Sequence, residues 1–197
     1  MKFEDHALKS SFSYIAILLA LIALGVVARV LPHPPNFSPM AAIALFAGFL
    51  FIKRYTAFMV VIVSLLLTDY FLLGSLSVDY LGSNTMLVVY AALLFPIIFK
   101  GFLRAKLSGP RVAIAALTSS VVFFVSTNFA VWMFSPMYDK TWSGLVLCYT
   151  MAIPFFHYTV MGDLLWSGAV FGTYYLVRNI SGSVELNNTN PLLFGNN

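Results

Sequence analysis

Apolar residues run in six long stretches along the chain, separated by short segments rich in proline, glycine and polar residues. The stretches cover residues 12–31, 39–52, 55–73, 85–99, 112–134 and 156–177. A membrane with a hydrocarbon core about 30 Å thick is crossed by roughly 20 helical residues, and most of the stretches approach that length. The pattern predicts an all-α integral membrane protein, a bundle of six transmembrane helices.

The second stretch, residues 39–52, is shorter than a full crossing. At about 1.5 Å per residue its helix reaches only about 21 Å. Ser38 suits the N-cap and Pro39 the first helical position, so a helix is expected there. A re-entrant helix remains the alternative to a full span.

A further apolar run, residues 144–177, is too long for one crossing because its helix would extend about 51 Å. Pro154 interrupts it, and proline usually breaks or kinks a helix. We therefore expect a break there, with residues 144–153 forming a separate short helix or a partly inserted segment near the outer face.

Composition agrees with lipid as the main solvent. The chain is 60% hydrophobic and 9% charged with a mean hydropathy of +0.90, whereas soluble domains are about 25% charged. With a cytosolic N-terminus, nine Lys and Arg residues lie inside and only Arg29 and Lys140 outside. This distribution favours both termini in the cytosol, in the inner membrane of the cell. A five-span topology with an external N-terminus places eight cations inside and three outside, and stays open.

The chain is expected to be one domain. Residues 1–11 are interpreted as a cytosolic N-terminal segment and residues 12–178 as the transmembrane domain. Residues 179–197, rich in Asn, Gly and Ser, are expected to be a loosely ordered polar tail.

Polar side chains at membrane depth are costly and mark candidate sites. In the six-span topology they all fall in the outer half of the bilayer, which predicts one polar cavity that opens outward. The candidate substrate-binding residues are Asn36, Asp69, Asn128, Trp132, His157 and Asp163. Arg29 is an alternative partner for Asp69 or Asp163, which would make that pair structural. Asn128 could equally form a hydrogen bond between helices.

Catalytic motifs are missing from the sequence, so no enzyme activity is predicted. The lack of a P-loop implies that active transport needs a partner or an ion gradient. His157 and Asp163 are six residues apart, about 120° around a helix, and do not form a metal pair. Neither a metal nor another cofactor is expected. Ala16 and Ala20 form a small-residue stripe on which another helix could dock.

Several of these residues together resemble a poorly characterised bacterial family of proposed transport proteins, over residues from about 28 to 178. They are the segment 33–39, Thr127 and Asn128 with Trp132, residues 154–156, and Gly162 with Asp163. That family in turn is similar to the substrate-binding S components of energy-coupling-factor (ECF) transporters. The resemblance implies a six-helix bundle and a substrate pocket near the external face. It also implies docking of a membrane coupling subunit, with its ABC-type ATPases, at Ala16 and Ala20.

The expected function is therefore uptake of a small molecule, such as a vitamin or related micronutrient, by a substrate-binding component. Three alternatives remain open. One is an ion-coupled secondary transporter with Asp163 as the carrier. Another is an integral-membrane enzyme with His157 and Asp163 as acid and base, and the last is an assembly or scaffold protein without a ligand.

Overall fold

The computed structural model describes residues 2–188 of the chain, with the side chains of residues 13–77 and 79–179. All regular secondary structure in this range is helical. Its elements are α1 (Lys2–Val30), α2 (Met40–Leu50), α3 (Arg54–Leu73), α4 (Val78–Leu81), α5 (Asn84–Leu94), the 3₁₀ helix η1 (Phe95–Phe99), α6 (Lys100–Ala105), α7 (Gly109–Phe134) and α8 (Trp142–Asn188). No strand occurs in this range, so the all-α prediction is confirmed.

Five helical segments among the described residues are long and apolar enough to cross a membrane. They are Ser13–Val30, Arg54–Leu73, Asn84–Ala105, Gly109–Phe134 and Trp142–Asn179. Large apolar side chains cover the outside of these helices, for example Leu19, Phe71 and Leu165, each more than half exposed. A surface of this kind is stable in lipid and unfavourable in water.

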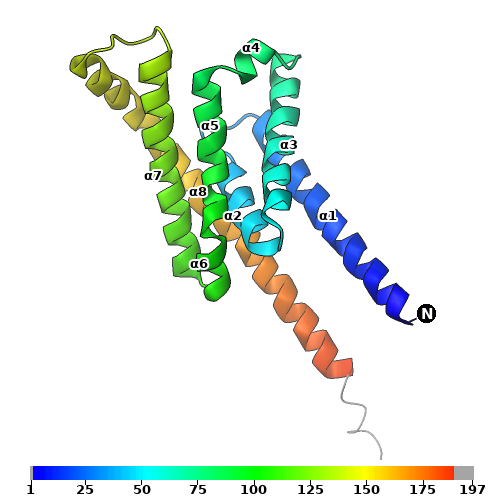
Figure 1. Cartoon of the computed structure of the whole chain (residues 1–197). Helices are drawn as coiled ribbons and strands as arrows, with labels where there is room; N and C mark the ends of the chain where they lie inside the picture. Colours follow the sequence, from blue (N-terminus) through cyan, green and yellow to red (C-terminus); the bar gives the residue numbers. More distant parts are fainter. Residues whose placement is uncertain (1, 189–197) are drawn as a thin grey trace, which may run out of the picture.

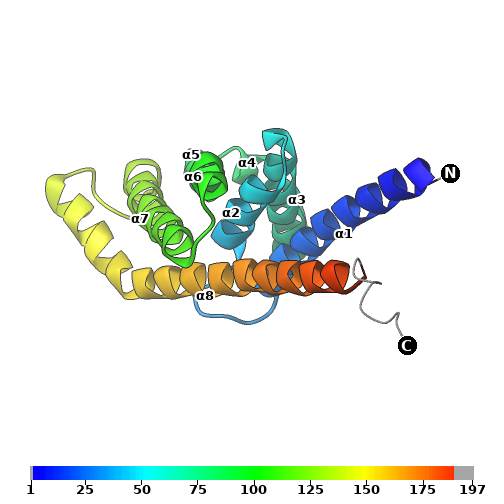
Figure 2. The ribbon, with the colours of Figure 1, turned by 90° about the horizontal axis from the view of Figure 1, so that it is seen from below.

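The short helix α2 forms the centre of the bundle. Nine of its eleven residues are buried, as expected for a helix that is apolar on every side. Its small residues allow close packing: a Cβ atom on Gly48 would lie 3.2 Å from the Cα atom of Ile97 in η1. Figures 1 and 2 show α2 enclosed by α3, α5 and α8.

Residues 31–39 and α2 together carry the chain from the upper end of α1 to the lower end of α3 (Figure 1). The four prolines at positions 32, 34, 35 and 39 predict a stiff loop at the outer surface. The last part instead turns into the bundle, where Pro39 is fully buried. A Cβ atom on Gly162 of α8 would lie 3.1 Å from the Cα atom of Phe37. A non-helical segment thus contacts the side of α8, and α2 needs only about 16 Å of helix to reach α3.

Helix α8 corrects the prediction of a break at Pro154. It runs as one helix of 47 residues with Pro154 inside it. Figure 2 shows a bend in its first third, which is the usual effect of a proline inside a helix. The helix also continues to Asn188, so the first part of the predicted loose tail is helical. The rest of that tail, residues 189–197, lies outside the described residues.

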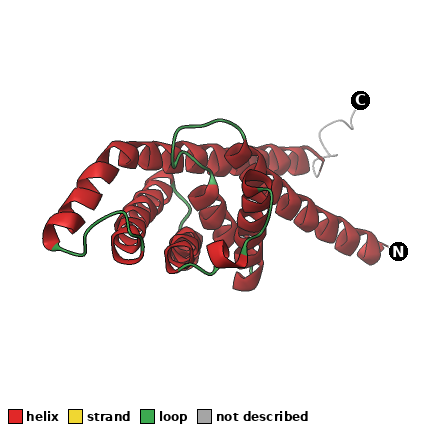
Figure 3. Ribbon diagram, turned by 90° about the horizontal axis from the view of Figure 1, so that it is seen from above, coloured by secondary structure: helices red, strands yellow, loops and turns green. Residues whose placement is uncertain are grey.

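The connections are divided between the two ends of the bundle. Seen from above, Figure 3 shows residues 31–39, 74–83 and 135–141 around one end. The starts of α1, α3 and α7 and the end of α8 lie at the opposite end (Figure 1). The described N-terminal residues form the first turns of α1, continuous with the rest of that helix.

Candidate substrate site

Two neighbouring cavities between α7 and α8 contain three of the six candidate residues, Asn36, Asn128 and Asp163. The smaller cavity, about 20 Å³, is lined by Asn36, Asp163 and other polar residues. The larger, about 110 Å³, is lined by Asn36 and Asn128. Both are lined by Asn36, Phe123 and Thr159, so they share one wall.

Asp163 is buried on the inner side of α8. Its Oδ2 atom accepts a hydrogen bond of 2.6 Å from the Ser120 hydroxyl of α7. Ser38, Ser119 and Thr159 also line the cavity beside it. A volume of about 20 Å³ accommodates roughly one water molecule. Asp163 has no cation as an ion-pair partner among the described residues. The cavity beside it is lined by hydroxyl and amide groups together with apolar side chains such as Leu93 and Pro96.

The larger cavity is polar on one side and aromatic on the other. Asn128 and Thr127 come from α7, and Phe155 and Phe156 come from α8. The Phe124 and Phe156 rings are 4.6 Å apart between centroids and close one wall. Such a combination of aromatic walls and a few polar groups is typical of small-molecule sites. The volume is nevertheless below the roughly 300–1,000 Å³ of pockets that enclose drug-sized ligands.

The α7 residues make hydrogen bonds within their own helix. Asn128 donates from Nδ2 to the Phe124 carbonyl oxygen at 2.7 Å, and Thr127 donates to the Phe123 carbonyl oxygen at 2.7 Å. The Asn128 amide keeps its oxygen as an acceptor and a second N–H as a donor. The carboxyl group of Asp163 nearby favours ligand groups that donate hydrogen bonds or carry positive charge.

Local backbone geometry places Asn36 at this site. Asn36 has a φ of 63°, the left-handed region that asparagine tolerates better than most residues. Directly after it, Phe37 lies against Gly162, where any larger residue would meet the backbone. The turn at Asn36 and the missing side chain at Gly162 together bring the loop to the cavity wall.

Asp69 belongs to a separate buried cluster formed by α1, α3 and α5. Arg29 forms an ion pair with it, with 3.6 Å between Nη2 and Oδ1, and the Tyr90 hydroxyl donates a hydrogen bond to it. Of the two partners considered for Arg29, Asp69 and Asp163, the structure therefore shows Asp69, and the pair is structural. Burial, and then the Asp69 charge, raise the pKa of the Tyr80 hydroxyl in α4, while Arg29 lowers it.

Trp132 and His157 line neither cavity. The Trp132 indole nitrogen donates to the Asp139 carbonyl oxygen at 2.9 Å, and the Lys140 ammonium group donates to the Trp132 carbonyl oxygen. Trp132 thus anchors residues 135–141. His157 is exposed, and its ring lies 3.8 Å from that of Tyr158.

Sequence reasoning missed Ser120 and Thr159, which lie beside Asp163. Both are polar residues inside apolar stretches, and a polar residue in such a stretch is also the signal that singled out Asn128. Hydroxyl groups in membrane helices usually bond to the carbonyl four residues earlier, as Ser120 does to Ala116 at 3.1 Å. The signal therefore does not distinguish Ser120, which also reaches Asp163, from Ser126, whose hydroxyl donates to the Val122 carbonyl oxygen of its own helix at 2.7 Å.

The remaining candidates lie on α1. Ala16 and Ala20 are both exposed, on the outside of the bundle. Among the residues that the structure describes, no three His, Cys, Asp or Glu side chains come together in a way that could hold a metal ion.

Long apolar helices with large apolar side chains on their outer surface define this molecule as an all-α membrane protein. More particularly, the chain belongs to the family described as "Family of unknown function (DUF6580)", whose model matches residues 9–184. That range includes all the elements except the beginning of α1 and the end of α8. Comparisons with curated proteins and with solved structures gave no match.

Proposed function

We propose that this protein transports a small solute across the cell membrane and binds it between α7 and α8. The observation that carries the proposal is the pair of adjoining cavities at Asn36, Asn128 and Asp163. Buried polar groups in a membrane protein are expensive unless they serve a specific partner. These groups lie beside a non-helical segment, as in transporters whose sites form where a helix is interrupted.

In this proposal the chain crosses the inner membrane six times, and both termini are cytosolic. Segment 31–50 supplies the second crossing although α2 alone is too short. The cation distribution supports the orientation, because Lys53, Arg54, Lys106 and Arg111 lie in the α2–α3 and α6–α7 connections and in the first turns of α3 and α7. Figure 1 shows these segments at one end of the bundle. The cavities then lie toward the exterior, from which the solute enters.

The solute is expected to be cationic or to donate hydrogen bonds, because the Asp163 carboxyl group lines the smaller cavity and has no ion-pair partner among the described residues. A vitamin-sized molecule requires more room than about 110 Å³. In the uptake proposal, α7 and α8 separate to admit it, and the bend at Pro154 is where α8 can flex.

Energy for uptake comes from a partner in this proposal, as in an S component of an ECF transporter. The sequence has no P-loop, so ATP hydrolysis is assigned to separate ABC-type ATPases. Exposed Ala16 and Ala20 on α1 are the proposed docking stripe for the coupling subunit, since small side chains let a second helix approach closely.

The decisive experiment is mass spectrometry of small molecules that copurify with the protein. We expect a bound compound in the wild type and its loss in an Asn128→Ala/Asp163→Ala variant. His157→Ala is the matched control, because His157 lies on the same helix but outside both cavities. Loss of the compound from His157→Ala as well, or its retention by the double variant, would contradict the site.

Ion-coupled secondary transport is the second candidate, favoured by the cavity of about 20 Å³ beside Asp163. It is large enough for one small ion or water but not for an organic solute. This reading predicts that Asp163→Asn abolishes transport while solute binding survives, and that an uncoupler stops uptake. Uptake that withstands the uncoupler but stops on depletion of ATP would favour the S-component proposal.

A further inference from the structure

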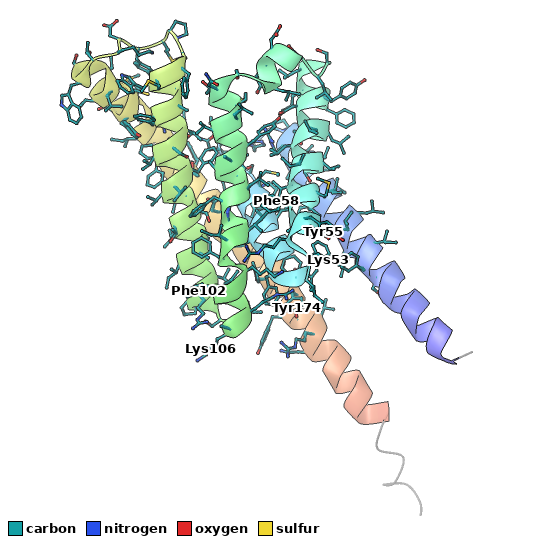
Figure 4. All side chains as sticks on the ribbon, viewed as in Figure 1. Lys53, Tyr55, Phe58, Phe102, Lys106 and Tyr174 are labelled. Atoms are coloured by element: carbon teal, nitrogen blue, oxygen red, sulfur yellow. The ribbon has the colours of Figure 1, made fainter. Side chains whose placement is uncertain are left out.

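A positively charged pocket lies at the lower end of the bundle, far from the cavities at Asp163. It has a volume of about 580 Å³, and its walls include Arg104, Lys106, Arg178, Leu50 and Tyr174. We call it the basic pocket. Figure 4 shows Lys106, from the turn between α6 and α7, and Tyr174 of α8 at this same end.

The charges of the basic pocket are not neutralised by the described residues. Arg104 is held in place by its Nε–Phe49 carbonyl and Nη2–Leu50 carbonyl hydrogen bonds, of 2.6 and 2.9 Å. These bonds cap the end of α2 but leave the charge uncompensated. Lys106 and Arg178 make no side-chain ion pair with the described residues. None of the acidic side chains that the structure describes lines this pocket.

An apolar groove of about 550 Å³ begins at the basic pocket and runs along the outside of the bundle between α1 and α8. Leu50, Tyr174 and Arg178 line both the groove and the pocket. Figure 2 shows α1 and α8 diverging from the end of α1 toward the N-terminus. Phe46 forms the floor of the groove, and the Tyr174 ring packs edge-on against it at 5.6 Å.

A second apolar groove, of about 440 Å³, lies between α7 and α8 and meets the basic pocket at Leu107. The basic pocket therefore joins two apolar grooves. The first groove follows α8 from Arg178 to Trp166, about 18 Å of helix. That length is close to half of a hydrocarbon core about 30 Å thick, and thus to the reach of one acyl chain.

We propose that this surface binds an anionic phospholipid, with its phosphate in the basic pocket and its acyl chains in the two grooves. Arginine and lysine bind phosphate through charge-assisted hydrogen bonds, and basic pockets between membrane helices bind anionic headgroups. The apolar grooves continue directly from the pocket, so a lipid fits the surface better than a free phosphate does. The inference does not depend on the transported solute.

The test is native mass spectrometry and thermal melting of the full chain purified in neutral detergent. We expect phosphatidylglycerol to bind and to raise the melting temperature more than phosphatidylcholine does, and glycerol phosphate alone to do neither. In Lys106→Gln/Arg178→Gln the affinity for phosphatidylglycerol should fall by about 30-fold, equivalent to about 2 kcal/mol for two cations.

The matched control is Lys53→Gln/Arg54→Gln, which removes two cations from the same end of the bundle but outside the pocket. It should retain the wild-type affinity. Ala20→Phe, which fills the first groove from α1, should weaken lipid binding while leaving all charges in place. Ala20→Phe thus supplies an independent test if the double variant does not fold.

Three results would overturn the proposal. Equal losses in the two charge variants would mean a general surface attraction rather than a site. An equal effect of glycerol phosphate or inorganic phosphate would mean a phosphate site without a lipid. A bound mass that corresponds to a polypeptide, present on the wild type and absent from Lys106→Gln/Arg178→Gln, would assign the surface to a protein partner.

Discussion

Asp69 and Asp163 show how two buried carboxyl groups in similar sequence surroundings acquire different roles. Asp69 lies beside Arg29 and Tyr90, so its charge is compensated within the bundle. Asp163 accepts a hydrogen bond from Ser120 and faces a cavity instead. The sequence indicates only that both are costly in lipid. Which one has a cation nearby depends on the rotation of α1 relative to α3 and α8.

Loss of Arg29 should destabilise the protein through Asp69. In Arg29→Met, Asp69 remains buried without its cation, and breaking buried pairs costs about 3–5 kcal/mol. Arg29 is partly exposed, so we expect a smaller loss of about 2 kcal/mol. Arg29→Met/Asp69→Asn should recover most of it, as measured by thermal melting in detergent. A double variant as unstable as Arg29→Met would show that the charge of Asp69 is not the cause.

Contact between Gly162 and the turn at Asn36 should control the candidate site. In Gly162→Ala the new Cβ atom would lie 3.1 Å from the Cα atom of Phe37, so the loop must give by a few tenths of an ångström and displaces the adjacent Asn36 at the cavity wall. We expect reduced retention of the copurified compound. Gly168→Ala is the control, because no atom lies within 4 Å of the position of its Cβ. Equal retention in the two variants would contradict this role of Gly162.

At the scale of elements, the apolar stretches predicted which segments form helices, and most helix ends lie within a few residues of the predicted ends. The exceptions are α1 and α8. Helix α1 begins at Lys2, ten residues before its apolar stretch, whereas α2 matches its stretch to within two residues. Helix α8 is longer because Pro154 bends it without ending it. In a bundle, neighbouring groups can satisfy a carbonyl that a proline leaves free, so the helix continues.

Replacement of Pro154 should straighten α8. With alanine, residue 154 can donate a hydrogen bond to the Thr150 carbonyl oxygen and the ring clash disappears. Spin labels at the exposed residues Ser143 and Leu176, in a Cys148→Ser background, should therefore move farther apart in Pro154→Ala. Ile153→Ala, at an exposed neighbouring position, should leave the distance unchanged. An unaltered distance in Pro154→Ala would show that packing, and not the proline, causes the bend.

For the whole molecule, one end of the bundle carries the connections after α1, α3 and α7, and the opposite end is rich in cations. The cavities proposed for the solute and the basic pocket lie at different ends, while Ala20 belongs both to the proposed docking stripe and to the first apolar groove. Both proposals depend on the same arrangement, in which α2 fills the centre of the bundle. Helix α8 lines the smaller cavity together with residues 31–39, and further along it lines the basic pocket. The proposed orientation in the membrane therefore fixes which end of the whole bundle faces the exterior.

Labelling of intact cells with a membrane-impermeant thiol reagent tests that orientation. In a Cys148→Ser background, a Met137→Cys variant should be labelled from outside, because Met137 is exposed in the connection between α7 and α8. A Lys2→Cys variant should be labelled only after permeabilisation. Labelling of the latter in intact cells would favour the five-span topology with an external N-terminus.

The sequence by itself determined that the chain is helical and belongs in a membrane, because apolar length and charge are local properties that add up along the chain. It also indicated Asn36, Asn128 and Asp163 as polar groups in need of partners. Only the tertiary structure decided that these three share adjoining cavities while Asp69, Trp132 and His157 lie elsewhere. The reason is geometric: the rotation and tilt of each helix decide what a side chain faces. Close contacts at residues such as Gly48 and Gly162 set this rotation and tilt, and each contact joins segments that are far apart in the sequence.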